Sequence, residues 1–284
     1  MPDDAHARWP LGIMIVCGYE QHALPAQLDV VRRLGATHVE LYPRWTGRPD
    51  ARDVARTVGD FGIAVWSAHG PWGSETWQPG RVDLAATDAA ARRASVDDVR
   101  RAIAWLADAA GTRLVVHPGV LSDESQLAAR RAALVESLSE LAPVAAGHGV
   151  HLCVENLPPT CWPGSRMSDL VAIVSELAAT HVGLCLDTGH ANIVADAASF
   201  ARTAGPWLRT THVHDNDGTR DEHRLPGQGS VRWADLSVAL AEIDYCGVIM
   251  IECPRYLRQR PDEVNDQLRQ RLADLCRRPG HSPP

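Results

Sequence analysis

A short apolar, β-branched run followed by a helix-like stretch recurs eight times along the chain. Short runs of this kind are typical of buried strands, and Ala/Leu/Arg-rich stretches with apolar residues every three or four positions are typical of helices. The expected strands cover 11–17, 38–42, 63–68, 114–117, 150–155, 182–187, 208–214 and 248–252. The expected helices cover roughly 24–34, 50–60, 85–110, 124–146, 168–178, 196–204, 233–242 and 261–276.

Eight strand–helix pairs in a chain of 284 residues predict an α/β fold of the (β/α)8 barrel type. The alternative is an open, doubly wound sheet, but no GxGxxG follows the first expected strand. No linker or low-complexity block divides the chain. We therefore expect a single barrel domain over residues 1–276 and a disordered tail over 277–284.

The composition excludes two kinds of chemistry. No lysine is present, and all 28 basic residues are arginine, so neither a Schiff base nor a Walker-type phosphate loop can form. Thirteen histidines and 35 acidic residues favour acid–base or metal chemistry.

Several features predict a cytoplasmic protein with no membrane partner. The first residues do not resemble a signal peptide, and no apolar run is long enough to span a bilayer. The seven cysteines include no CxxC pair, which favours reduced thiols. A net charge of −7 without a basic stripe makes nucleic acid an improbable partner.

The active site of such a barrel lies at the carboxyl ends of its strands. Six consecutive expected strands end on side chains that can bind a metal: His69, His117, Glu155, Asp187, His214 and Glu252. Loop residues add His190, Asp221 and His223. Successive side chains of a strand point to opposite faces of the sheet. If Glu155 and Asp187 point into the barrel, their neighbours Val154 and Leu186 point outward to the helices, as expected for aliphatic residues.

Carboxylates mixed with imidazoles suit a divalent metal such as Zn, Mn, Fe or Co, and less readily Mg. Glu155 and Glu252 come from strands on opposite sides of the barrel. They could exchange protons with opposite faces of a sugar carbon while the metal holds an enediolate. A Ser-His-Asp hydrolase is disfavoured because no GxSxG is present. Cys153 and Cys185 lie below the mouth, which disfavours a cysteine nucleophile.

The ordered motifs resemble the xylose-isomerase-like TIM-barrel superfamily, which includes sugar-phosphate isomerases and epimerases and endonuclease IV. The strings that carry this resemblance are HGPW, VVHPG, VENLP, LDTGHAN, HVHDND, DEHRLPGQG and VIMIE, between residues 69 and 252. The epimerases of this superfamily imply one divalent metal on Glu155, Asp187, His214 and Glu252. They also imply Glu155 and Glu252 as the acid/base pair and His190 as a contact to a substrate hydroxyl.

The same resemblance implies an alternative. All nine residues that hold three zinc ions in endonuclease IV have counterparts here, so His69, His117, His190, Asp221 and His223 are candidate additional ligands or substrate contacts. A trinuclear phosphodiesterase or apurinic endonuclease is therefore the alternative function. A metal-dependent lyase or biosynthetic enzyme on another small molecule is a further one, and a non-catalytic binder is the last.

Three further residues are candidate contacts to the substrate. His223 lies where some epimerases carry arginine, so Arg224 is a candidate substrate contact, as are Trp72 and Glu40. Glu40 could equally form a structural ion pair, and His212 is expected to be a buried, hydrogen-bonded histidine. We expect a metal-dependent isomerase or epimerase, of the isomerase class, acting on a sugar, sugar phosphate or related polyhydroxy carbonyl compound. It would use no organic cofactor, and it could form a homo-oligomer.

Overall fold

Eight parallel strands form one sheet in the order β7-β6-β5-β4-β3-β2-β1-β8 in the computed structural model, which describes residues 8–72, 82–259 and 263–280. The strands are β1 (Leu11–Cys17), β2 (His38–Pro43), β3 (Ala64–His69), β4 (Arg113–Val116), β5 (His151–Glu155), β6 (Val182–Asp187), β7 (Leu208–His212) and β8 (Ile249–Ile251). The sheet closes between its two end strands, because Val213 N donates to Met250 O at 2.7 Å and Glu252 N donates to Val213 O at 3.0 Å. The predicted (β/α)8 barrel is confirmed.

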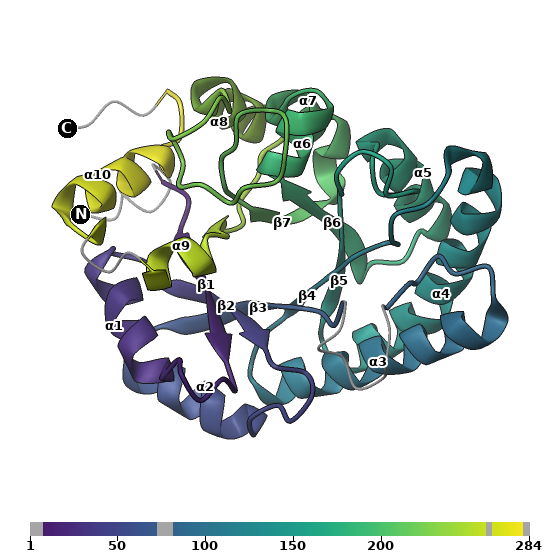
Figure 1. The fold of residues 1–284 in the computed structure, drawn as a ribbon, viewed down its shortest axis with the longest axis horizontal. Helices are drawn as coiled ribbons and strands as arrows, with labels where there is room; N and C mark the ends of the chain where they lie inside the picture. The colour runs from purple at the N-terminus through teal and green to yellow at the C-terminus, as the bar shows by residue number, and fades with distance from the viewer. Residues whose placement is uncertain (1–7, 73–81, 260–262, 281–284) are drawn as a thin grey trace.

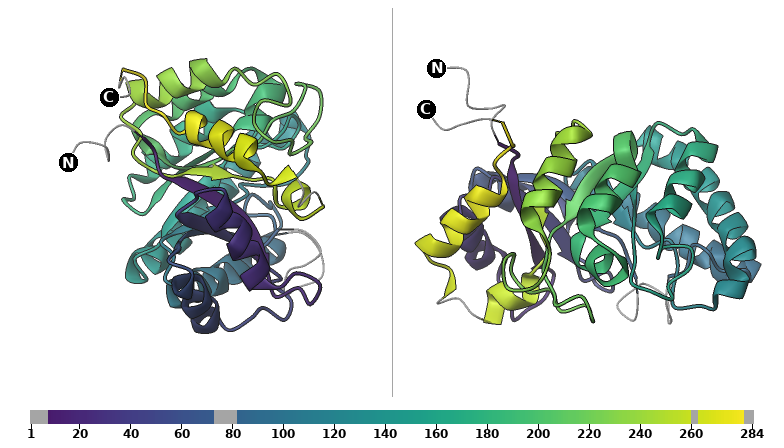
Figure 2. Two further views of the ribbon diagram at one scale, coloured as in Figure 1. Left: turned by 90° about the vertical axis from the view of Figure 1, so that its left-hand side faces the viewer. Right: turned by 90° about the horizontal axis from the view of Figure 1, so that it is seen from above.

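The helices form an outer layer around the strands (Figures 1 and 2). They are α1 (Leu24–Arg33), α2 (Ala51–Asp60), α3 (Ala89–Asp108), α4 (Leu127–Gly147), α5 (Met167–Leu177), α6 (Thr188–Val194), α7 (Ala197–Ala204), α8 (Trp233–Glu242), α9 (Pro254–Gln259) and α10 (Asp266–Leu275), with short 3-10 helices η1 (Glu124–Gln126) and η2 (Gly205–Trp207). None of the helices in the described part of the chain is long and apolar enough to cross a membrane.

The core lies between the strands and this helical layer. Outward-facing aliphatic residues such as Val39, Leu114 and Leu184 are fully buried there. Cys153, Cys185 and Val115 instead form a small separate cluster inside the barrel. This division follows from the two-residue period of the strands, and it leaves the polar inward positions to build the site.

Two helices lie at the carboxyl ends of strands where the sequence pattern predicts none. Helix α6 starts directly after β6, and the Asp187 carboxylate caps it by accepting a hydrogen bond from His190 N at 2.7 Å. Helix α9 follows β8, and Leu257 N donates to Cys253 O at 3.1 Å at its start. Both helices bring loop residues back to the rim of the barrel.

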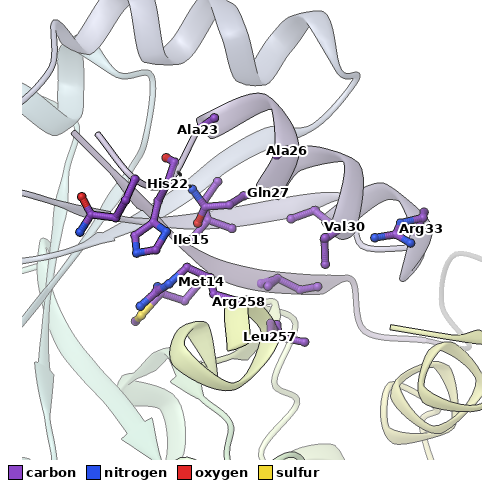
Figure 3. A pocket seen from close by; sticks show the side chains of 13 residues that line it. Met14, Ile15, His22, Ala23, Ala26, Gln27, Val30, Arg33, Leu257 and Arg258 are labelled. Carbon is purple, nitrogen blue, oxygen red and sulfur yellow. Dashed lines mark hydrogen bonds between the residues drawn. The ribbon is translucent and has the colours of Figure 1, made fainter. Parts of the chain in front are cut away.

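Strand β8 spans three residues, so it pairs with β1 only from Leu11 to Ile13. Further along β1, Gln27 from α1 takes the place of a neighbouring strand. Its side-chain amide accepts from Val16 N at 3.0 Å and donates to Val16 O at 2.9 Å. A cavity of about 350 Å³ lies beside this side chain, between α1 and α9, and Figure 3 shows Gln27, Val30 and Leu257 on its walls. None of the predicted site residues lines it.

Part of the predicted disordered tail packs onto the barrel. Arg277 forms an isolated β-bridge with Arg8, and the Arg278 guanidinium lies 5.3 Å from the ring centroid of Trp9. Residues 281–284 of that tail lie outside the described residues.

Candidate metal and acid–base site

Four buried side chains meet at the carboxyl ends of β5, β6, β7 and β8. Glu155, Asp187, His212 and Glu252 each offer one ligand atom, and these four atoms all lie within 4.8 Å of one another. Parallel strands bring such residues together because all their carboxyl ends face the same mouth. Three carboxylates in so small a buried volume require a cation or protons to compensate their charge.

His214 lies one layer above His212 and against Asp187. Its Nε2 atom is 3.0 Å from Asp187 Oδ2, and its ring stacks on that of His223 with centroids 4.0 Å apart. Its Nδ1 atom is buried without a hydrogen-bond partner. Gly189 makes room for this ring, since a Cβ at that position would lie 2.0 Å from His214 Cε1.

His69 and His117 lie on the other side of Glu155. The Nε2 atom of His117 is 3.3 Å from Glu155 Oε2, and that of His69 is 3.9 Å from the same oxygen. Trp72 covers them at the mouth, with its ring centroid 5.2 Å from that of His117, and it is 46% exposed. An exposed aromatic ring above a polar site is suited to contact a bound ligand.

His190, Asp221 and His223 form a group at the rim beside His214. The Asp221 Oδ2 atom lies 3.4 Å from His190 Nε2 and 3.2 Å from His223 Nε2. His190 also contacts Asn156 O through Nδ1 at 2.9 Å, which orients its ring. All nine predicted ligand positions are thus gathered at one mouth.

Glu40 forms the structural ion pair that was one of its two predicted roles. It is fully buried below the site, where it accepts a hydrogen bond from Ser67 Oγ at 2.5 Å and lies 2.8 Å from His212 Nε2. Both of its oxygens are therefore engaged by protein groups, as expected for a structural ion pair. Its partner His212 uses the other ring nitrogen, 3.1 Å from Glu155 Oε1 and 3.0 Å from Glu252 Oε2.

Arg224 is held in the loop after β7 by acidic side chains. Its guanidinium lies 2.6 Å from Glu222 Oε2 and 3.4 Å from Asp217 Oδ2. Asp215 organises the same loop by accepting from Val231 N, Gly227 N and Trp233 Nε1, among others. A substrate contact by Arg224 would have to compete with these carboxylates.

The electrostatics of the site follow from these contacts. Burial alone would raise the pKa of Glu155, but His212 and His117 hold it well below its usual range. Burial alone would also lower the pKa of His190 and of His223, but neighbouring carboxylates raise each to about 10. The Glu155 carboxylate is therefore ionised at neutral pH.

The two buried cysteines behave differently. Burial raises the pKa of Cys153 to about 12 and that of Cys185 well above its usual value, so both stay protonated thiols.

The residues fit a divalent metal ion. Glu155 Oε2 and Glu252 Oε2 are buried beside imidazole nitrogens, from His117 at 3.3 Å and from His212 at 3.0 Å. His214 Nδ1 is buried and has no hydrogen-bond partner among the described residues. A divalent ion among the carboxylates would balance their charge, and a buried polar atom such as His214 Nδ1 normally has a partner. The donor set of carboxylate oxygens and imidazole nitrogens suits Mn, Zn, Co, Fe or Mg.

Sequence reasoning did not include His212 among the site residues. Its signal was present, because His212 and His214 are two positions apart and so lie on the same face of the strand. The Asn156 side chain also supports the site. It fixes the end of β6 by accepting from Asp187 N at 2.8 Å and donating to Asp187 O at 3.0 Å.

Known proteins resemble this chain in both sequence and fold. An uncharacterised protein of Methanocaldococcus jannaschii, MJ1311, is 30% identical over 167 residues, which is 57% of each chain. The D-psicose 3-epimerase of Agrobacterium fabrum is 34% identical over 120 residues, 42% of this chain and 40% of that enzyme. The chain therefore matches about half the length of these relatives.

A solved structure of D-psicose 3-epimerase, determined in the presence of D-fructose, superposes with a TM-score of 0.70 and 26% identity over 84% of each chain. The sequence profile of one family, described as xylose isomerase-like TIM barrel, matches residues 28–275. A chain matched over nearly its whole length by this profile, and built as an eight-stranded barrel, belongs to the xylose isomerase-like TIM barrel family.

Proposed function

We propose that this protein is a divalent-metal-dependent epimerase or isomerase of a sugar or a related polyhydroxy carbonyl compound. The observation that carries the proposal is the group of three buried carboxylates and one histidine at one mouth, whose ligand atoms all lie within 4.8 Å of one another. The likeness to D-psicose 3-epimerases supports the same class of reaction.

Glu155, Asp187, His214 and Glu252 would hold the metal, with His212 below them. When bound, the metal would stabilise negative charge on the substrate oxygens next to the reacting carbon. Glu155 and Glu252 would act as the acid/base pair. One carboxylate removes the proton from the carbon beside the carbonyl, and the other carboxylate returns a proton to the opposite face.

The surrounding residues would position the substrate. His190 and His117 lie beside Glu155 and can contact substrate hydroxyl groups, while Trp72 covers the mouth. His212 contacts both acid/base carboxylates and so fixes their separation. No side chain supplies an imine-forming amine, so the reaction cannot proceed through a Schiff base.

Solvent isotope exchange tests this proposal. The metal-supplemented enzyme is incubated in D2O with a panel of three- to six-carbon ketoses and their phosphates, and deuterium at the carbon beside the carbonyl is measured by NMR. We expect incorporation with at least one ketose and its loss in Glu155→Gln. Failure of every ketose to exchange, with metal bound, would contradict the proposal.

A second candidate function is phosphodiester cleavage by a trinuclear zinc centre. The favouring observation is that potential ligands form adjoining groups around Glu155, around His190 and around Asp221 with His223. The metal content of the purified protein separates the two candidates. One ion per chain supports the epimerase, whereas three zinc ions with cleavage of abasic DNA would support the phosphodiesterase.

A further inference from the structure

The opposite end of the barrel carries a second group of ionisable side chains. They lie where the strands begin, far along the strands from the carboxyl-end site: His38 starts β2, Arg113 starts β4 and His151 starts β5. His181 precedes β6, and Arg209 is the second residue of β7. We call these five residues the basal cluster, and each is half-buried.

The members of this cluster pack against one another. Arg113 and His151 are direct neighbours in the β4–β5 ladder, and the rings of His151 and His181 stack with centroids 4.7 Å apart. The Arg113 guanidinium lies 3.4 Å from the ring centroid of Trp66, which also meets the edge of His38. Trp66 is itself fixed by a hydrogen bond from Nε1 to Thr210 Oγ1 at 3.1 Å.

Gly183 gives Arg209 its place in the cluster. A Cβ at Gly183 would lie 2.5 Å from Arg209 Cγ, so the arginine stem occupies the space that a side chain on β6 would need. Gly183 is paired with Cys153, two residues after His151 on β5. Arg209 therefore lies across β6, on the side of the strand next to His151.

Neither Arg113 nor Arg209 has an acidic partner in the part of the chain that the structure describes. None of the ion pairs formed by the described residues includes Arg113 or Arg209, whereas the buried arginines Arg92 and Arg130 end on carboxylates at 2.6 Å and 2.9 Å. Arg113 Nη1 donates to Thr112 Oγ1 at 2.7 Å, and Arg209 Nη1 donates to Pro206 O at 2.6 Å. Each guanidinium therefore keeps donor groups that these contacts do not use.

His151 adds an unpartnered ring nitrogen to the cluster. The Nδ1 atom of His151 is buried without a hydrogen-bond partner in the described structure, as is Arg113 Nε. Burial lowers the pKa of His151, and His181, Arg113 and Arg209 lower it further. The cluster thus carries the charges of two arginines and donor positions that are not filled, and no carboxylate in the described part of the chain pairs with either arginine.

We propose that the basal cluster is a binding site for a small oxyanion of the phosphate type, either inorganic phosphate or the phosphate group of a small metabolite. Guanidinium groups bind phosphate oxygens in a paired geometry, and two of them balance the charge of a dianion. Stacking on Trp66 holds one guanidinium in place before binding. This site is separate from the proposed acid–base site and does not depend on the reaction carried out there.

Calorimetry with defined variants tests the site. The metal-loaded protein is titrated with inorganic phosphate, and separately with sulfate and with a sugar monophosphate, to distinguish the free anion from an esterified one. We expect one phosphate per chain for the wild type and an affinity about tenfold lower or worse in both Arg113→Gln and Arg209→Gln. Arg131→Gln is the matched control, because Arg131 lies on α4 and pairs with Glu176.

Two further measurements keep the result decisive. Arg209→Lys keeps the charge but loses the paired geometry, so it should bind phosphate more weakly than the wild type and more tightly than Arg209→Gln. Each variant is checked for an unchanged thermal midpoint, so that misfolding is not read as lost binding. Equal phosphate affinity in the wild type, Arg113→Gln and Arg209→Gln, or no binding by the wild type, would overturn the proposal.

Discussion

Glu40 on β2 and His212 on β7 meet inside the barrel, with Glu40 Oε1 2.8 Å from His212 Nε2, and both side chains are fully buried. The other nitrogen of the same ring touches the two carboxylates proposed as acid and base. A carboxylate that contacts one ring nitrogen of an imidazole fixes the ring orientation and determines the protonation of the other nitrogen. Glu40 on β2 therefore sets the orientation of His212, which lies below the proposed metal site.

Glu40→Gln should weaken metal binding by about 10–100-fold, because His212 would lose the carboxylate that orients it. Competition with a chromogenic chelator measures the affinity. Glu20→Gln, an exposed residue, is the control and should leave the affinity unchanged. Wild-type affinity in Glu40→Gln would show that His212 needs no such orientation.

Gly189→Ala should remove His214 from its place without breaking α6. Alanine favours a helix over glycine by about 0.5–1 kcal/mol, but its methyl group would lie 2.0 Å from His214 Cε1. The expected result is a folded protein with strongly reduced metal affinity and a cost of about 1–3 kcal/mol from overpacking.

Gly59→Ala in α2 is the matched control, since no atom lies within 4 Å of a Cβ at that position. It should be neutral or slightly stabilising in a urea melt. If Gly189→Ala bound metal as the wild type does, His214 would not be a ligand.

The acid/base pair should be separable by isotope exchange. Glu155→Gln and Glu252→Gln should each lower kcat for epimerisation by about 10²–10⁴-fold. With one base left, each variant should still exchange deuterium into one epimer of the substrate and not into the other. Metal content is measured alongside, and retained epimerisation in either variant would argue against the two-base assignment.

The metal-free protein should lose stability as the pH rises from about 6.5 to about 10. The pKa values of His190 and His223 are raised to about 10 in the folded state. Their contribution to the free energy of unfolding is therefore complete below the ordinary histidine pKa, and it is lost progressively as the pH rises from there toward about 10. Thermal midpoints of the stripped protein between pH 6 and pH 9 measure this trend. His223→Gln should flatten it, and a midpoint that rises with pH would contradict these shifts.

Metal affinity should change in the opposite direction. His190 and His223 lie beside the proposed ligands, and their positive charge repels a metal ion until they lose their protons, so affinity should rise over the same pH range. The difference in thermal midpoint between the metal-loaded and the stripped protein should therefore be larger above neutral pH than below it. Equal midpoints at every pH would indicate that no metal is bound.

The sequence was a good guide to strands and a poorer guide to their ends. The expected strand over 208–214 stops at His212, because Asp215 turns the chain and pairs with Arg224. Helix α6 was missed because LDTGHAN reads as the end of a strand and a turn. Asp187 three residues before the His190 amide was nevertheless a capping signal.

A site residue could be predicted when its place at the end of a strand already determines where its side chain lies. Glu155 and Asp187 end their strands, so alternation gave their direction directly. Glu40 sits in the middle of β2, and only the tilt of the strands across the closed barrel decides whether such a residue reaches the mouth or lies below it. Its contact with His212, 172 positions away in the sequence, was therefore not predictable.

The hydrogen bonds of Gln27 to Val16 have a consequence for how the barrel tolerates change. Around most of the ring, neighbouring strands are joined by peptide groups, which every residue except proline supplies in full. At the junction of β1 and β8, the same two groups depend on the amide of one side chain. Gln27 belongs to helix α1, but its side chain does the work of a strand neighbour. Substituting it would therefore leave the backbone of β1 unpaired at Val16, just as a shorter neighbouring strand would.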